Sequence, residues 1–337
     1  MPPKYYLPTL ARNPLTRLRY RLLEHRRPLP DVPLHIQIET VAGCNASCVF
    51  CPNKKTQLQI PIGKKMDWDL YRKIVDEALD WGILRFSPYG NNEPMLDPEL
   101  PERIKYIADR KKKGQFTKIN SHGNLLTERM ARRLLDSGLD RLNFSVQGVD
   151  PALYEKIMGL KLEKTLANIE RFLELKRAGN YKRPRVRVCM LVTKYIEPQL
   201  PQIRQYWGAR GIKINLNQIE NRGDHQSLHN EQLAIHELKN FDWCNRMFEQ
   251  LYIQWDGHLI QCCADWEQFS KMGDARTQTL RAVWNGPVYR EYRERFLRGG
   301  VKGMLCDGCT KDAAGDEYAD WEGWAAQLRK SGDRVLT

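Results

Sequence analysis

The stretch that decides the fold is His35-Ile36-Gln37-Ile38-Glu39-Thr40-Val41, followed after two residues by Cys44-Asn45-Ala46-Ser47-Cys48-Val49-Phe50-Cys51. Residues 35–41 alternate between polar and apolar side chains, which predicts a β-strand. The cysteines that follow have the spacing C-x3-C-x2-C and therefore lie on one short loop at the end of that strand.

Apolar strands and longer helical segments alternate from this point to residue 220. The predicted strands are His35–Val41, Ile83–Ser87, Phe116–Asn120, Arg141–Val146, Val186–Thr193 and Lys213–Ile219. The predicted helices are Asp67–Asp80, Pro98–Lys113, Thr127–Ser137, Pro151–Met158, Glu163–Ala178 and Leu200–Arg210. Strands that alternate with helices imply a parallel sheet. The predicted fold class is α/β, a partial (β/α)6 TIM-like barrel with a small cysteine-rich C-terminal domain.

Residue composition divides the chain into five segments. They are a basic N-terminal extension (1–34), the barrel (35–220), a polar, turn-rich linker (221–240), a cysteine-rich domain (241–312) and a C-terminal tail (313–337). Within the fourth segment, Trp255–His258 is predicted to be the tip of a hairpin between Gln250–Gln254 and Leu259–Cys262.

Composition excludes several classes of protein. The chain has 337 residues, 42% of them hydrophobic, which excludes a disordered or collagen-like chain. No apolar run is long enough for a membrane span or a signal peptide, so we expect a cytoplasmic protein whose nine cysteines bind metal or do chemistry. The net charge of +13 is spread along the chain without interleaved aromatic residues, so we expect no nucleic-acid partner. A basic cleft would favour an anionic substrate.

The first cysteine group suits an iron–sulfur cluster with one open iron. Three thiolates, from Cys44, Cys48 and Cys51, can hold three irons of a cubane and leave the fourth without a protein ligand. An open position is typical of a reactive metal site, whereas structural sites are closed. A zinc site with a distant fourth ligand, or a chance spacing, are the alternatives.

This loop, with its aromatic Phe50, resembles the signature of the radical S-adenosylmethionine (SAM) superfamily. The resemblance implies a [4Fe–4S] cluster whose fourth iron is chelated by the amino and carboxylate groups of SAM. It also implies that an electron, from a donor such as flavodoxin or ferredoxin, cleaves SAM to methionine and a 5′-deoxyadenosyl radical. That radical takes a hydrogen atom from the substrate.

Polar segments follow the next strands in the order that the family would show. Gly90-Asn91-Asn92-Glu93 resembles the G-x-x-E segment that binds the methionine amine, with Asn92 where the family often has Gly. Asn120 lies in a segment similar to the T-N-G turn, and Ser145-Val146-Gln147-Gly148 is similar to S-x-D-G, with Gln147 in place of Asp. The resemblance implies SAM contacts from Gly90, Asn92, Glu93, Asn120, Ser145, Gln147 and Val192. Turn chemistry and helix capping are the alternative for each polar residue.

A second group, Cys244, Cys262, Cys306 and Cys309, can complete a cluster with no open iron. Its spacing around Gly257 resembles the start of a SPASM domain. Because no further cysteine follows Cys309, the resemblance implies the shortened twitch version with one auxiliary [4Fe–4S] cluster. A zinc ribbon is the alternative, since four cysteines ending in C-x2-C also suit tetrahedral zinc.

Cys263 adjoins Cys262, and neighbours in an extended chain point to opposite sides. It is therefore either a buried thiol or, as in some radical SAM epimerases, a hydrogen-atom donor that faces the barrel mouth. Cys189 is expected in the core. Asp265 and His258 are either substrate contacts or ordinary polar groups at a turn.

The sequence thus predicts a radical SAM oxidoreductase or epimerase that acts on an unactivated C–H bond of a small molecule resembling a carbohydrate or aminocyclitol. Residues 1–34 are too short for a winged-helix leader-binding domain, which favours a small molecule. A peptide-modifying radical SAM/SPASM maturase is the alternative. A metal-binding module without catalytic activity is the alternative from another class.

Overall fold

The protein is described here from a computed structural model. The structure describes residues 30–54, 61–223, 227–240 and 244–312. The predicted C-terminal tail and all but the end of the predicted N-terminal extension lie outside the described residues. No helix in the described ranges is both long and apolar enough to cross a bilayer.

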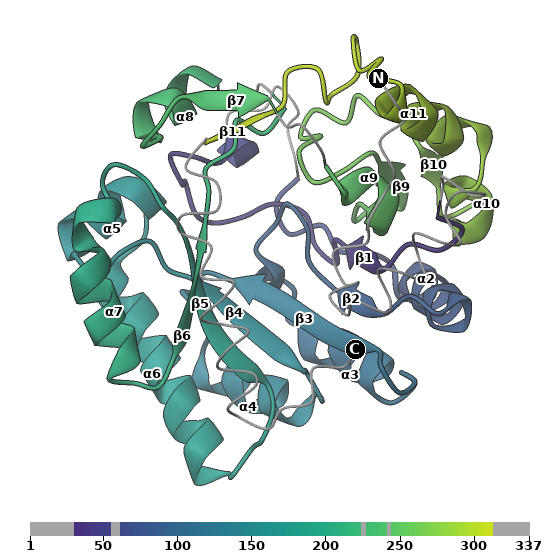
Figure 1. Ribbon diagram of the computed structural model, residues 1–337. Helices are drawn as coiled ribbons and strands as arrows, with labels where there is room; N and C mark the ends of the chain where they lie inside the picture. Colours follow the sequence, from purple (N-terminus) through teal and green to yellow (C-terminus); the bar gives the residue numbers. More distant parts are fainter. Residues whose placement is uncertain (1–29, 55–60, 224–226, 241–243, 313–337) are drawn as a thin grey trace, which may run out of the picture.

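Six parallel strands form the main sheet and lie side by side in chain order (Figure 1). They are β1 (His35–Ile38), β2 (Arg85–Ser87), β3 (Phe116–Ser121), β4 (Arg141–Ser145), β5 (Arg185–Leu191) and β6 (Lys213–Asn217). Within the described residues β6 ends the sheet, so the barrel is open, as the partial-barrel prediction requires. All six strands overlap the segments that the sequence predicted as strands.

Helices cover the outer face of this sheet. They are α2 (Trp68–Trp81), α3 (Leu100–Ala108), α4 (Glu128–Asp136), α5 (Pro151–Met158), α6 (Leu162–Ala178) and α7 (Leu200–Gly208). Outward-facing strand residues such as Leu142 and Phe144 pack on them, with the rings of Phe144 and Phe172 meeting edge to face at 6.0 Å. The α/β prediction is confirmed, because each strand buries one apolar face against a helix.

Local sequence sets the ends of these helices. The Asp67 carboxylate accepts hydrogen bonds from the backbone N–H groups of Asp69 and Leu70, which caps α2 at its N-terminus. Gly82 ends the same helix in the left-handed conformation, at φ 88°. Thr127 and Asp150 cap α4 and α5 in the same way as Asp67.

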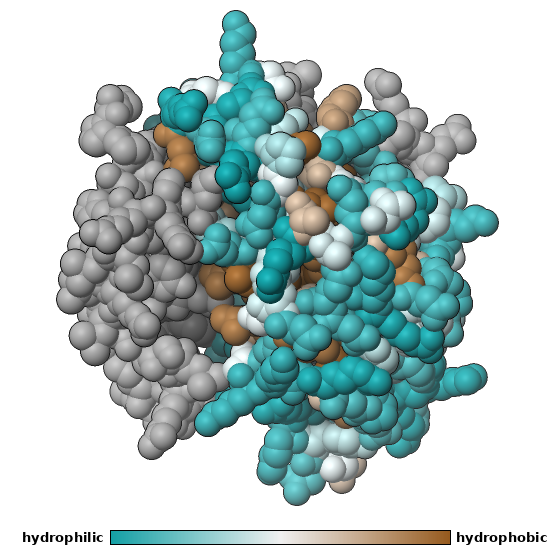
Figure 2. Space-filling model, turned by 90° about the vertical axis from the view of Figure 1, so that its right-hand side faces the viewer, coloured by the Kyte–Doolittle hydropathy of each residue, from teal (hydrophilic) through white to brown (hydrophobic). Residues whose placement is uncertain are grey.

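The C-terminal region extends the same sheet. Strand β8 (Gln250–Ile253) pairs in parallel with β1, and β9 (His258–Ile260) and β10 (Gly273–Asp274) follow as antiparallel neighbours. The predicted hairpin is confirmed, with the backbone N–H of Gly257 bonded to the carbonyl of Gln254. The remaining helices are α9 (Arg246–Glu249), α10 (Leu280–Trp284) and α11 (Pro287–Leu297). The face of the molecule that carries α10 and α11 is largely hydrophilic (Figure 2).

The segment predicted as a linker has structure of its own. It contains α8 (Ser227–Leu233) and β7 (Leu238–Asn240), and β7 pairs antiparallel with β11 (Thr310–Asp312). Leu233 and Ala234 are buried in a small apolar cluster with Ile219. The polar composition of 221–240 hid these contacts, because their partners lie far away in the sequence.

A buried ion pair fixes the loop after β2. The Arg103 Nε donates to the Asp97 carboxylate at 2.8 Å, and both side chains are almost fully buried. Arg103 also donates to the Met66 carbonyl and lies over the rings of Trp68 and Tyr71. Helix α3 is thereby joined to the segment that leads into α2.

Candidate active site

The loop that carries Cys44, Cys48 and Cys51 lies at the carboxyl end of β1. Its backbone is held by α5, because the N–H groups of Ser47 and Val49 donate to the carbonyls of Met158 and Ile157. All three cysteines are partly exposed, and none forms a disulfide bond. The spacing in the sequence therefore gives three thiols on one anchored loop.

The electrostatics of these thiols suit a cationic cluster. Burial raises the pKa of Cys48 well above its usual range, and the neighbouring Cys51 and Cys44 raise it further. Thiolates are the metal-binding form, so a positive group is needed to stabilise three of them together. In the described ranges no three His, Cys, Asp or Glu side chains converge on a point that would suit a single metal ion. A cubane fits this donor set because each thiolate binds a different iron.

The segment after β2 packs against this loop. The Asn92 amide donates to the Val41 carbonyl at 2.7 Å and its oxygen accepts from the Gly90 N–H. A Cβ atom on Gly90 would lie 2.1 Å from the Tyr252 hydroxyl, so only glycine fits there. Gly90 and Asn92 therefore shape the loop.

Glu93 provides a carboxylate at the carboxyl ends of β1, β2 and β3. It is 2% exposed and accepts from the Ser121 hydroxyl at 2.7 Å and from the His122 N–H at 3.1 Å. The His122 ring lies 3.0 Å from the Asn45 amide oxygen in the cysteine loop. The ends of β1, β2 and β3 are thus joined through Glu93, and His122 is a member of the site that the sequence did not single out.

The other residues predicted to contact SAM differ in whether a polar side-chain atom lacks a hydrogen-bond partner. The Asn120 side-chain oxygen is buried and has no hydrogen-bond partner. The Gln147 side-chain oxygen, in contrast, accepts from the Leu191 N–H at 2.9 Å and joins β4 to β5. Ser145 lies in register with Cys189, and Val192 is buried beside the end of β5. The Asn120 side-chain oxygen can therefore accept a hydrogen bond from a ligand, whereas the Gln147 oxygen already accepts one from the backbone.

The second group of cysteines gathers beside the hairpin. Burial raises the pKa of Cys306 to about 11 and of Cys309 to about 12, and in both cases the nearby Cys244 contributes. Cys244 likewise raises the pKa of Cys262, after burial and Cys263. The Gln261 amide donates to the Cys306 sulfur at 2.9 Å. Cys244 thus interacts electrostatically with Cys262, Cys306 and Cys309, and their joint role as ligands of an auxiliary cluster stays a prediction.

Cys263 begins a turn after β9 and is partly exposed. Burial raises the pKa values of Tyr252 and Tyr89, and both tyrosines also experience the Cys263 thiol. Burial alone would lower the pKa of Arg222, but Glu220 and Cys263 raise it beyond that effect. Cys263 thus lies among residues of both the barrel and the cysteine-rich domain. Cys189 lies on β5, where its thiol accepts from Asn215.

The side chains of Asp265 and His258 already have hydrogen-bond or ion-pair partners within the protein. Asp265 is buried and accepts from the N–H groups of Phe269 and Ser270. The His258 ring lies 2.9 Å from the Asp256 carboxylate and 3.2 Å from Arg276.

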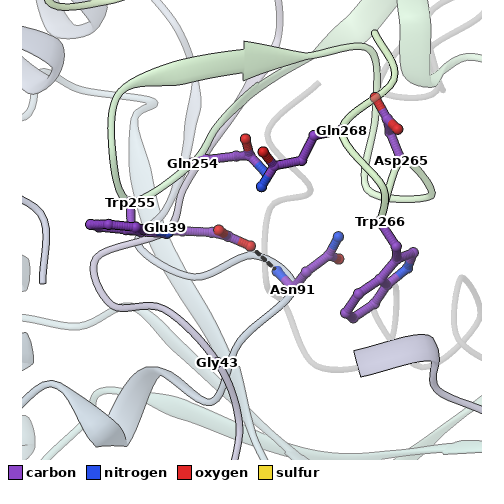
Figure 3. Close-up of a pocket in the computed structure, with 8 residues that line it drawn as sticks. All are labelled: Glu39, Gly43, Asn91, Gln254, Trp255, Asp265, Trp266 and Gln268. Atoms are coloured by element: carbon purple, nitrogen blue, oxygen red, sulfur yellow. Dashed lines mark hydrogen bonds between the residues drawn. The ribbon is translucent and has the colours of Figure 1, made fainter. Parts of the chain in front are cut away.

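A pocket lies where the two domains meet (Figure 3). Its lining includes Glu39, Gly43 and Asn91 from the barrel and Gln254, Asp265 and Trp266 from the cysteine-rich domain. Gly43 directly precedes Cys44, so the pocket adjoins the cysteine loop.

The Glu39 carboxylate points across this pocket towards Asn91 (Figure 3). It accepts from the Asn91 N–H at 2.6 Å and from the Tyr252 hydroxyl at 2.9 Å. Burial raises its pKa to about 7 in spite of these bonds. The Gln254 side-chain oxygen and the Trp266 indole N–H are buried without partners. No pattern in the sequence indicated the pair of Glu39 and Tyr252, because it joins positions 213 residues apart.

Comparison with known families supports the interpretation of both cysteine groups as iron–sulfur sites. The model of the radical SAM superfamily matches residues 38–186, and the model of the SPASM iron–sulfur cluster-binding domain matches residues 244–310. The chain belongs to the radical SAM superfamily. Radical SAM membership implies a [4Fe–4S] cluster and SAM, and the SPASM domain implies auxiliary iron–sulfur binding.

Curated relatives of the chain are named for different activities. A "Probable GTP 3′,8-cyclase" of Methanococcus maripaludis is 33% identical over 51% of this chain, which spans only 54% of that relative. A "Tungsten-containing aldehyde ferredoxin oxidoreductase cofactor-modifying protein" of Pyrococcus furiosus is 24% identical over 82% of this chain and 86% of its own length. A "PqqA peptide cyclase" of Granulibacter bethesdensis is 32% identical over 39% of this chain and 33% of its own length.

Solved radical SAM structures share the fold. Streptococcus suis SuiB bound to its precursor peptide SuiA has a TM-score of 0.63 at 16% identity, over 83% of this chain and 72% of SuiB. BtrN in complex with AdoMet and 2-DOIA has a TM-score of 0.57 at 18% identity, over 82% of this chain and 93% of BtrN. One of these neighbours holds a peptide and the other a small molecule, so the fold alone leaves the substrate class open.

Proposed function

We propose that this protein is a radical SAM enzyme that removes a hydrogen atom from an unactivated C–H bond of a small molecule and oxidises or epimerises that carbon. The observation that carries the proposal is the parallel pairing of β8 with β1. Because parallel strands end at the same edge, the hairpin of the SPASM domain emerges beside the Cys44 loop. Both cysteine groups then face one substrate space.

The roles of the residues follow from their positions. Cys44, Cys48 and Cys51 hold the cluster, Glu93 accepts from the amine of SAM, and the unpaired oxygen of Asn120 accepts from another donor of the cofactor. When bound, the cluster and SAM supply the 5′-deoxyadenosyl radical. Gly90, Asn92, Ser145, Gln147 and Val192 shape the cofactor site. Cys244, Cys262, Cys306 and Cys309 hold an auxiliary cluster, and flavodoxin or ferredoxin is the class of electron donor.

Cys263 decides between the two outcomes. In epimerisation its thiol gives a hydrogen atom to the opposite face of the substrate radical, and an external donor then returns one electron and one proton to the sulfur. In dehydrogenation the substrate radical would instead lose a proton and an electron, and the auxiliary cluster that Cys244, Cys262, Cys306 and Cys309 would hold would accept that electron. The location of Cys263 among residues of both domains supports the first outcome.

Anaerobic reconstitution tests the cluster assignments. Two cubanes predict about eight irons per chain and release of 5′-deoxyadenosine after reduction with SAM present. Cys44→Ala is expected to lose about four irons and the deoxyadenosine, whereas Cys309→Ala is expected to disturb only the auxiliary site. Zinc in place of iron, or no deoxyadenosine from the wild type, would leave a metal-binding module without catalytic activity.

A single substitution separates epimerisation from dehydrogenation. Cys263→Ala is expected to keep SAM cleavage and to lose the epimerised product. Cys189→Ala, the matched control, removes a thiol that is not among the proposed ligands and is expected to keep both activities. Normal product from Cys263→Ala would make Cys263 structural and favour dehydrogenation.

A peptide substrate is the second candidate, supported by the likeness to peptide-bound SuiB and to PqqA peptide cyclase. Mass spectrometry of candidate substrates incubated with SAM and reductant would separate the two classes. A modified peptide, with no change in any small molecule, would establish a maturase.

A further inference from the structure

The pocket between the barrel and the cysteine-rich domain has an acidic and polar lining (Figure 3). Its eight described lining residues include two carboxylates, those of Glu39 and Asp265, and no Lys, Arg or His. Most of the remaining lining consists of three carboxamides and two indoles, from Asn91, Gln254, Gln268, Trp255 and Trp266. The whole chain has a net charge of +13, so this lining departs from the charge of the rest of the protein.

Glu39 is 6% exposed, and every donor that hydrogen-bonds to its carboxylate within the described residues is neutral. The donors are the N–H groups of Asn91 and Trp255 and the Tyr252 hydroxyl. A carboxylate has about four acceptor positions, so these donors leave at least one for a ligand. Burial raises the pKa of Glu39 to about 7, with a smaller contribution from Asp256. A cation bound beside Glu39 would favour its charged form.

The cysteine-rich domain adds a second carboxylate and an unpaired acceptor. Asp265 is fully buried and accepts from the N–H groups of Phe269 and Ser270, which are neutral donors as well. Gln254 is 6% exposed, and its buried side-chain oxygen has no hydrogen-bond partner in the described part of the chain. Figure 3 shows the Gln254 amide and the Glu39 carboxylate reaching into the same space. Each domain therefore offers an acceptor to one ligand group.

The size of the cavity limits this ligand group to a small one. A cavity volume of about 20 Å³ is enough for one group of the size of water or ammonium. A protonated primary amine donates three hydrogen bonds and balances a negative charge, whereas a neutral hydroxyl donates one and balances none. Tryptophan attracts cations more strongly than the other aromatic residues, and both Trp255 and Trp266 line the cavity. The lining therefore favours an ammonium group.

We propose that this cavity, here called the amine pocket, binds a protonated primary amino group of a small-molecule substrate. The amino group donates to the Glu39 carboxylate and to the Gln254 side-chain oxygen. Gly43 lines the amine pocket and directly precedes Cys44, so an amine bound here holds the neighbouring carbons of the ligand beside the cysteine loop. Glu39 is thereby a residue that determines substrate specificity. This inference deepens the proposed function and rests on it for the identity of the ligand as the substrate.

Direct binding tests the amine pocket without turnover. Reconstituted full-length protein would be titrated by anaerobic calorimetry at pH 8 with cyclohexylamine, which stays protonated there as a lysine side chain does, and with the neutral cyclohexanol. We expect cyclohexylamine to bind and cyclohexanol to bind about tenfold more weakly or not at all.

Two variants remove the acceptors singly. Glu39→Gln keeps the shape of the side chain and is expected to weaken cyclohexylamine binding about tenfold or more, because a hydrogen bond between charged groups is lost. Gln254→Met keeps the length of the side chain and is expected to weaken binding several-fold. Glu128→Gln is the matched control, since Glu128 is an exposed carboxylate on α4 that pairs with Arg132 and Arg171. The control is expected to bind cyclohexylamine like the wild type.

Three results would overturn the inference. The first is cyclohexylamine affinity that is equal in the wild type and in Glu39→Gln, or absent in both. The second is equal affinity of the wild type for the amine and the alcohol. The third is tighter binding of an acetylated tripeptide with one central lysine, which would assign the amine pocket to a peptide. Release of 5′-deoxyadenosine, measured on the same samples, reports separately on the proposed radical chemistry, so either proposal can fail without the other.

Discussion

Replacing Lys118 by methionine is expected to stabilise the protein. Burial and the neighbouring Arg85, Arg141 and Arg187 lower the pKa of Lys118 from 10.5 to about 7. Because a tenfold change in acid dissociation corresponds to about 1.4 kcal/mol, the protonated lysine destabilises the folded state by on the order of 5 kcal/mol. Methionine keeps the length of the side chain and removes the charge. We expect the free energy of unfolding at pH 6 to rise by about 1–4 kcal/mol, the gain that replacing a buried ion pair by apolar residues can give.

The sign of the pH dependence follows from proton binding. Between about pH 7 and 10.5 the unfolded chain holds more protons on Lys118 than the folded protein does, so this lysine makes wild-type stability rise with pH. The advantage of Lys118→Met is therefore complete below about pH 7 and shrinks as pH approaches 10.5. His35, Cys189 and the three arginines are the other charged or titratable groups that face Lys118.

Guanidinium unfolding of the reconstituted protein at pH 6 and pH 9.5, followed by tryptophan fluorescence, measures the difference. Lys105→Met removes an exposed cation on α3 and is expected to change stability by less than about 0.5 kcal/mol. A loss of stability in Lys118→Met at pH 6, or the same gain at both pH values, would refute the reasoning that burial and neighbouring arginines disfavour the charged form of Lys118.

Three further outcomes are expected. Arg103→Met leaves Asp97 as an unpaired buried charge and should lower the free energy of unfolding by about 3–5 kcal/mol, whereas the double variant with Asp97→Asn should recover part of that loss in the same denaturant titration. The pKa of Glu39 is raised by burial to about 7, above its unfolded value, so Glu39→Gln should stabilise the protein at pH 8 and have little effect at pH 4; an equal effect at both pH values would contradict the raised pKa. Tyr252→Phe removes the hydroxyl that donates to Glu39 and should cost about 1–3 kcal/mol at pH 8, and no loss would show that Asn91 alone satisfies the carboxylate.

Several features of this protein follow from the sequence alone. The succession of apolar strand segments and helical segments from residue 35 to 220 predicted all six barrel strands, and Asp67 predicted the start of α2. These signals are local, because the period of a strand or the cap of a helix depends on residues within a few positions. The Cys44 loop is local in the same sense, and it was sufficient to indicate the radical SAM family, which the match to residues 38–186 then showed.

Only the tertiary structure decided how distant segments meet. The parallel pairing of β8 with β1, the bond between Glu39 and Tyr252, and the strand β7 within the predicted linker each join residues far apart in the chain. The row of Lys118, Arg141 and Arg185 also depends on register, since a shift of one residue in a strand would turn its cation towards the helices. Sequence gives the composition of a strand, but the face and the partners of each side chain are set by long-range pairing, which local periodicity does not encode.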